Sequence, residues 1–396
     1  MAHKNWLSHG TLRLSYSLVG EQTTASNALA VYRSGIMWHP QADQQQQYIY
    51  LSQLANSDLT YEKKKEFNIG VDLGFLSNRL NLTTDWYWRN NYDLMGYVNT
   101  AGAGGEVRKF ANVASMRSHG VEATISSQNI RTKDFDWSTD LTYAYTKTTI
   151  KDVLSQANVI NLVYNSGANI RKGYPHRSLF SIPFVGLNDE GIPTVINEKG
   201  EVTTTDINFQ EYQNLGFLKY EGPTEPTMNG GLNNTLRYKN WRLNVFVTYS
   251  FGNKIRLDQV FSSSYSDMSA MPKEFKNRWV MPGDEKVTTI PAIASVRQYY
   301  NDTQLSYAYN AYNYSTARVA DGGFIRLKDV SLTYDVPRTL LSKVGLSTAS
   351  IKLDATNLCL LYADDKLNGQ DPEFVNSGGV ATPLSKQFTL TVRLGL

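Results

Sequence analysis

The sequence predicts an all-β fold, an antiparallel transmembrane β-barrel segment of about twelve strands with short periplasmic turns and long extracellular loops. Apolar and polar residues alternate with a period of two over stretches of roughly ten residues, the length of a tilted strand that crosses a bilayer. Aromatic residues make up 12% of the 396 residues. Tyr and Trp are typical of surfaces that are apolar on one side and wet on the other, including membrane interfaces.

The clearest strands are two runs that meet near residue 75. Between 67 and 75 the odd positions are apolar, and Asn, Gly and Asp occupy the even positions. From 80 to 88 the even positions carry Leu80, Leu82, Thr84, Trp86 and Trp88. Residues 75–79 join the two runs, so we expect an antiparallel hairpin.

The same alternation recurs downstream, in segments 121–126, 135–145, 232–238, 241–251, 325–334 and 388–396. In the stretch 325–334 the apolar parity slips near Lys328 and Asp329, which predicts a β-bulge.

The connections alternate in length. The expected short turns are 75–79, 131–134, 172–176, 239–240 and 336–347. The expected long polar connections are 19–60, 92–116, 188–226, 252–322 and 358–384. Structureless loops of this length are uncommon in compact soluble domains, whereas transmembrane barrels combine short periplasmic turns with long extracellular loops. A soluble β-sandwich, whose strands alternate in the same way, remains the alternative.

Composition excludes several other classes. No run of about 18 apolar residues is present, so a membrane interpretation requires strands. The first residues, 1–6, lack the apolar region of a signal peptide. A net charge of +3 lacks the basic bias of a nucleic-acid binder. The single cysteine, Cys359, excludes an internal disulfide and a Cys-rich metal site.

No residues suggest catalysis, and we predict no catalytic residue, no metal site and no cofactor. The five histidines are scattered without metal-ligand spacing. A group of tyrosines in the long connection 252–322 is the candidate ligand-binding site: Tyr299, Tyr300, Tyr307, Tyr309, Tyr312 and Tyr314. These rings would stack on sugar rings or pack against a partner lid, and packing among themselves under the loop is an equal alternative.

Residues 323–337, which read GFIRLKDVSLTYDVP, are followed by Asn357-Leu358 and by QDPE at 370–373. Together with NIGVDLGFLSNR at 68–79 and YSFGNK at 249–254, they resemble the C-terminal barrel portion of SusC/RagA-type TonB-dependent outer-membrane transporters. The likeness begins near residue 12 and covers nearly the whole chain. On this resemblance, residues 1–396 are the C-terminal part of such a barrel, and the plug domain, TonB box and early strands have no counterpart in the sequence.

The resemblance implies TonB-dependent uptake of an oligosaccharide or peptide across the outer membrane of a Gram-negative bacterium. This chain would supply barrel wall and substrate-facing or lid-facing loops. The implied partners are a SusD-like surface lipoprotein, outer-membrane lipids, and the TonB complex through a plug segment that the sequence lacks. The alternative function is that of a soluble secreted β-sandwich that binds glycans.

Overall fold

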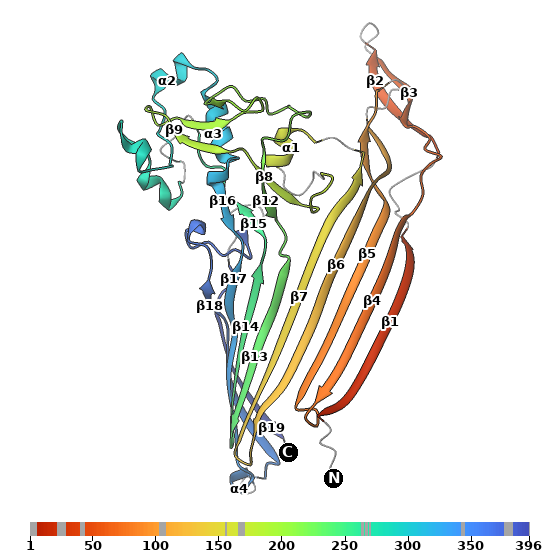
Figure 1. The fold of residues 1–396 in the computed structure, drawn as a ribbon, viewed down its shortest axis with the longest axis vertical. Coiled ribbons are helices and arrows are strands. Elements are labelled where there is room, and N and C mark those ends of the chain that lie inside the picture. Colours follow the sequence, from red (N-terminus) through yellow and green to blue (C-terminus); the bar gives the residue numbers. More distant parts are fainter. Residues whose placement is uncertain are drawn as a thin grey trace.

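The computed structural model describes residues 6–21, 29–39, 44–102, 108–154, 157–164, 171–262, 265, 268, 271–341, 345–375 and 383–395. The main element is a ten-stranded antiparallel sheet, in which each long strand pairs with the next one along the chain (Figure 1). Its strands are, in order, β1 (Leu7–Glu21), β4 (Glu62–Phe75), β5 (Leu80–Asn99), β6 (Arg108–Arg131), β7 (Phe135–Val153), β13 (Met228–Tyr238), β14 (Trp241–Phe251), β17 (Phe324–Asp335), β18 (Thr348–Tyr362) and β19 (Gln387–Gly395). Within the described residues the sheet is open, and β1 and β19 are its edges.

One end of the sheet, here called the turn end, carries the short connections. Leu76, Ser77 and Asn78 join β4 to β5 with left-handed φ angles of 53°, 58° and 62°. The short helix α4 (Arg338–Leu341) lies in the connection between β17 and β18. Both ends of the chain lie near this end of the sheet (Figure 1).

The opposite end carries a hairpin and a folded cap. The hairpin is formed by β2 (Val31–His39) and β3 (Gln44–Gln53). We define the cap as the described residues of 157–227, 252–322 and 363–375. Its elements are α1 (Val159–Tyr164), β8 (Ser178–Ser181), β9 (Phe184–Leu187), β10 (Pro193–Ile196), β11 (Val202–Thr203), β12 (Lys219–Pro223), β15 (Lys254–Arg256), η1 (Lys273–Asn277), η2 (Asp284–Lys286), α2 (Val296–Asn301), α3 (Leu305–Asn313), η3 (Thr316–Arg318), β16 (Val319–Asp321) and η4 (Asp365–Leu367).

The observed strands correct two expectations. The sheet has ten strands in the described residues rather than about twelve, because 172–176 is a cap segment and not a turn between two sheet strands. The expected long connection 92–116 is largely strand, since β5 and β6 stay paired up to Asn99 and Arg108. Register irregularities between Asn91 and Met95 interrupt the period of two in this part of the strands, so its apolar residues, such as Tyr97 and Phe110, show no regular alternation.

The outer face of the sheet is organised in rows of cross-strand partners. One aliphatic row consists of Leu82, Ile125, Leu141, Leu232 and Val247. An aromatic row lies nearer the turn end and consists of Phe135, Tyr238, Trp241 and Tyr334. A second aromatic row lies nearer the cap and consists of Tyr16, Phe67 and Trp88. Two aromatic rows on either side of an aliphatic band are typical of a strand sheet that crosses a membrane.

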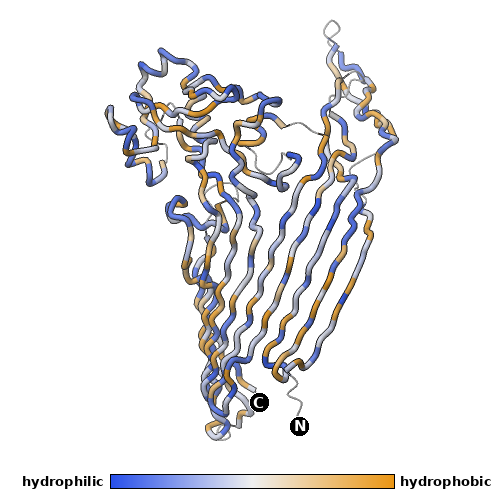
Figure 2. The backbone as a smooth tube through the Cα atoms, in the orientation of Figure 1, coloured by the Kyte–Doolittle hydropathy of each residue, from blue (hydrophilic) through white to orange (hydrophobic). Residues whose placement is uncertain are grey.

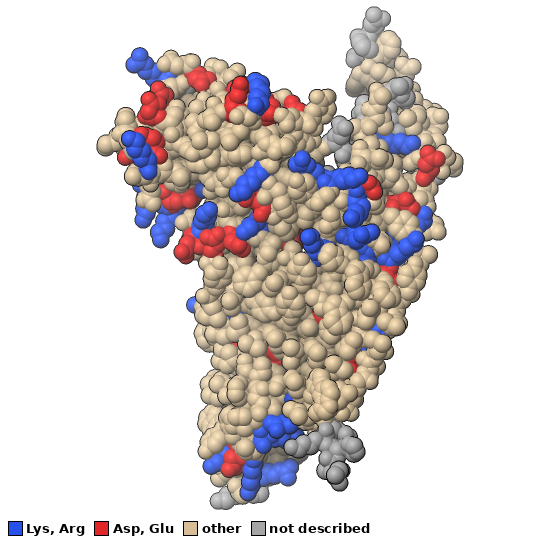
Figure 3. Space-filling model, in the orientation of Figure 1, with Lys and Arg blue, Asp and Glu red and all other residues tan. Residues whose placement is uncertain are grey.

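The figures show the same division. Hydrophobic and hydrophilic residues alternate along the long strands (Figure 2). Charged side chains gather around the cap and at the turn end, and between them lies a band with few charges (Figure 3). Among the described residues, no helix is both long enough and apolar enough to cross a membrane.

The predicted β-bulge is confirmed. Phe246 pairs with Asp329 and Val247 pairs with Leu327, so Lys328 is an extra residue in β17 relative to β14. The neighbouring strand β18 has a matching irregularity at Asn357, whose φ is 54°. Asn is among the few non-glycine residues that adopt this left-handed conformation readily, which gives the Asn357-Leu358 pair a structural reason.

Candidate functional site

The inner face of the sheet carries the polar residues and is the first part of the candidate site. One row of partners across it consists of Thr83, Thr124, Thr142, Gly231 and Thr248. A polar groove of about 410 Å³ lies on this face over the C-terminal strands, and its lining includes Arg242, Asn244, Asp329, Ser331, Lys352 and Arg393. Hydroxyl, amide and charged groups of both signs therefore face the same space.

Arg13 connects three strands of this inner face. Its guanidinium donates to Asp72 of β4 at 2.9 Å and to Asp85 of β5 at 3.1 Å. Gly70, its register partner in β4, has no side chain to separate these groups, because a Cβ atom there would lie 2.6 Å from the Asp85 carboxylate. The Arg13 side chain is 48% exposed, so this ion pair is solvated and contributes little to stability.

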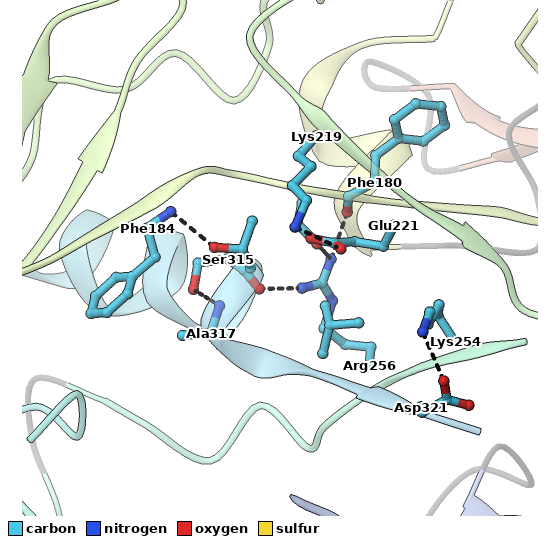
Figure 4. Close-up of polar contacts among 12 residues, drawn as sticks. Phe180, Phe184, Lys219, Glu221, Lys254, Arg256, Ser315, Ala317 and Asp321 are labelled. Carbon is cyan, nitrogen blue, oxygen red and sulfur yellow. Dashed lines mark hydrogen bonds and ion pairs between the residues drawn. The ribbon is translucent and has the colours of Figure 1, made fainter. Parts of the chain in front are cut away.

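Arg256 is the central polar contact of the cap (Figure 4). It donates to the Ser315 carbonyl at 2.8 Å, to the Phe180 carbonyl at 2.6 Å and to Ser181 Oγ at 3.1 Å. Burial lowers the pKa of its guanidinium to about 10, and the nearby carboxylate of Glu221 opposes that shift. Arg256 thus joins β15, β8 and Ser315 at the start of η3, which come from distant parts of the sequence.

Arg318 makes a second connection of this kind inside the cap. Only 2% of the residue is exposed. Its guanidinium pairs with Glu274, donates to the Asp258 carbonyl at 3.2 Å, and lies 4.9 Å from the ring centre of Phe261. The carboxylate and the aromatic face together compensate a charge that would otherwise be costly to bury.

The candidate tyrosines fall into two groups. Tyr309 and Tyr312 are 1% exposed and Tyr314 is 9% exposed, so all three belong to the cap core. The Tyr309 hydroxyl donates to the Ala292 carbonyl at 2.7 Å, and burial raises the pKa of both Tyr309 and Tyr312 above the usual range. Tyr300 and Tyr307 are 77% and 45% exposed. The side chain of Tyr299 lies outside the described residues.

The sequence did not point to three arginines with buried side-chain atoms, Arg256 and Arg318 in the cap and Arg326 on β17. The Nε atoms of Arg256, Arg318 and Arg326 are all buried. Each of the three stands between two apolar residues in the sequence, as in Ile255-Arg256-Leu257 and Ile325-Arg326-Leu327. Arg13 and Arg242 also stand between two apolar residues but have side chains that are 48% and 49% exposed, so the local sequence does not distinguish the buried arginines.

Comparison with known proteins identifies the fold. The family described as "TonB dependent receptor-like, beta-barrel" matches residues 3–358. TonB-dependent receptor P3 of Formosa agariphila is 25% identical over 393 residues, which cover 94% of this chain and 37% of the relative. TonB-dependent receptor SusC of Bacteroides thetaiotaomicron is 32% identical over 149 residues, which cover 36% of this chain and 14% of the relative.

A solved structure of the RagAB peptide transporter aligns with 99% of this chain and 41% of its own chain, with a TM-score of 0.74 at 22% identity. This chain thus spans well under half the length of the proteins it matches. The resemblance to SusC/RagA-type proteins and the antiparallel barrel fold class are confirmed, and the soluble β-sandwich alternative is not supported. The chain belongs to the TonB-dependent receptor β-barrel family, whose members lie in the outer membrane of Gram-negative bacteria.

Proposed function

We propose that this chain forms part of the wall and the extracellular cap of a TonB-dependent transporter that takes up an oligosaccharide or a peptide. The observation that carries this proposal is the division of the sheet into an apolar outer face and a polar inner face. Lipid contacts the outer rows, and the inner rows border an aqueous passage. The proposed activity is transport and includes no catalytic step.

Two lines of similarity support the choice of cargo and partners. One relative is named SusC, and one similar structure is a peptide transporter, RagAB. We therefore propose a SusD-like surface lipoprotein as the partner at the cap, and the TonB complex as the source of energy. Contact with the TonB complex would be made through a plug segment outside this sequence.

We propose Tyr300 and Tyr307 as the cargo contacts among the candidate tyrosines. Both rings are exposed, and Tyr307 stacks on Phe209 with ring centres 6.2 Å apart. Stacked, exposed rings offer a flat surface to a sugar ring or to an apolar peptide side chain. Tyr309, Tyr312 and Tyr314 would support this surface from the core below.

The experiment uses cells that carry the intact natural protein or a deletion of its gene. Uptake of labelled oligosaccharide and peptide pools is measured with and without TonB, and with and without a protonophore. We expect one pool to enter only when the gene, TonB and the proton gradient are all present. Uptake that is the same in the deletion strain, or in cells without TonB, would overturn the proposal.

The tyrosine assignment is tested in the same assay. Tyr300→Ala and Tyr307→Ala should each raise the KM for uptake about threefold or more, with little change in the maximal rate, because an aromatic stacking contact is worth about 1 kcal/mol. Tyr312→Phe, which keeps the buried ring, is the matched control and should leave KM unchanged. Unchanged KM in both alanine variants would remove these residues from the cargo site.

A further inference from the structure

Arg326 differs from the other arginines of the inner face in its environment. It lies on β17 opposite Thr248 of β14, which places it on the polar inner side of the sheet. Arg13 and Arg242 on the same face have side chains that are 48% and 49% exposed. The Arg326 side chain is 5% exposed. Something therefore covers this arginine, whereas Arg13 and Arg242 on the same wall are half exposed to water.

The cover is the segment 363–375, which follows β18 and which we call the final connection. Arg326 Nη2 lies 2.5 and 2.6 Å from the two carboxylate oxygens of Asp371, and 3.2 Å from Glu373. The Asp371 side chain is 7% exposed, whereas that of Glu373 is 40% exposed. The guanidinium also lies 5.4 Å from the ring centre of Phe324. One cation thus fixes two carboxylates from a segment 45 residues away.

The other half of the final connection, which is itself part of the cap, is attached to the cap segment 252–322. The Asp321 backbone N–H donates to the Asp364 carboxylate at 2.7 Å, and Lys366 donates to the Val319 carbonyl at 3.3 Å. Leu367, which is 1% exposed, packs in one core cluster with Ile255, Leu257 and Ala320. The final connection is therefore held at two places, on the cap segment 252–322 through Leu367 and on the wall through Arg326.

The ion pair of Arg326 with Asp371 is suited to fixing the position of the final connection rather than to a large gain in the stability of the protein. A buried ion pair gives a defined geometry, while its desolvation offsets much of its attraction. Loss of either partner leaves an uncompensated buried charge, so the segment would move away from the wall rather than remain in place. The sequence supplies both halves of this contact in the two stretches GFIRLKD and QDPE.

We propose that Arg326 is a positioning residue for transport, whose ion pair with Asp371 and Glu373 holds the final connection against the inner wall and so sets the width of the passage beneath the cap. This inference rests on the proposed transport function. The two sequence stretches act together, because GFIRLKD provides the cation on the wall and QDPE provides the segment that the cation holds.

The test uses the intact natural protein with Arg326→Gln, Asp371→Asn and the double variant. Arg177→Gln is the control, since its ion pair with Glu225, at 3.0 Å, lies in the cap outside the final connection and both side chains are at least half exposed. Hydrogen exchange is followed at the backbone amides of the final connection that donate hydrogen bonds, including those of Leu367, Gln370 and Phe374. The KM for uptake is measured for each variant in cells with equal amounts of protein in the outer membrane.

We expect exchange in the final connection to become at least about tenfold faster in both single variants, with no further increase in the double variant. Exchange in β17 and β18 should stay as in the wild type, and the KM for uptake should change about threefold or more. Arg177→Gln should change neither quantity. The agreement of two independent single variants guards against a folding defect in one of them.

Unchanged exchange in both single variants would show that the ion pair does not hold the segment. Faster exchange with an unchanged KM would show that the segment does not govern passage, and would equally overturn the proposal. Failure of the transport function itself appears differently, as absence of TonB-dependent uptake in the wild type.

Discussion

The sheet and the cap are built by opposite rules, although they belong to one chain. On the outer face of β1, Leu12 and Leu14 are 65% and 63% exposed. In the cap, Tyr309 and Tyr312 are 1% exposed. The cap thus has the buried core of a water-soluble protein, whereas the sheet presents large apolar side chains outward over its whole middle band.

This difference in the exposure of apolar side chains reflects the solvent around each region, lipid for the sheet and water for the cap. In the sheet, backbone hydrogen bonds between strands satisfy the polar groups, and lipid takes the place of a second apolar layer. In the cap, short strands and helices must bury apolar side chains against each other, because water surrounds them. The predictions below separate the two regions, from the largest expected effect to the smallest.

The largest effect is expected in the cap. Tyr312→Ala removes a ring that packs edge-on against Phe261 and Phe184, at 5.1 and 5.4 Å between ring centres. Loss of a buried aromatic ring should lower the free energy of unfolding of the cap by about 3–5 kcal/mol. Limited proteolysis in urea measures this change, and the heat-dependent gel mobility of the barrel should stay as in the wild type. Loss of cap stability together with loss of the heat-dependent gel mobility of the barrel would contradict the separation of the two regions.

The next effect is expected on the outer face of the sheet. Leu82 lies in the aliphatic row, so Leu82→Arg should cost about 2–4 kcal/mol in lipid vesicles, as measured by urea titration. Thr83→Arg is the matched control, because Thr83 faces inward beside Asp85 and Glu122. It should cost less than about 1 kcal/mol. Equal costs at the two positions would contradict the assignment of the faces.

The smallest effect is expected on the inner face. A Cβ atom at Gly70 would push apart Arg13 and Asp85, so Gly70→Ala should cost about 1 kcal/mol or less, mostly at low salt. At Gly10 the nearest atom to a new Cβ lies 3.5 Å away, and Gly10→Ala should show no dependence on salt. The comparison is made by urea titration at two salt concentrations. A cost at Gly70 that salt does not change would exclude the ion pair as its cause.

The same contrast explains how much of the structure could be predicted from the sequence. The sheet strands could be predicted because each has one apolar and one polar face, as in 67–75 and 241–251. The cap could not, since its strands are only two to five residues long, too short for an alternation to be recognised, and all four residues of β8 are buried. The pairing of Arg326 with Asp371 joins residues 45 positions apart, and no local sequence pattern predicts such a contact.

The bulge at Lys328 determines which residues of β17 face inward on each side of it. Asp329, Ser331 and Thr333 face inward on one side of it, and Arg326 faces inward on the other, although its number has the opposite parity. Removal of one residue here would turn Arg326 to the outside and bring Leu327 to the inside. Substitutions at Lys328 should therefore be tolerated during evolution, whereas single-residue insertions and deletions between 326 and 329 should be eliminated.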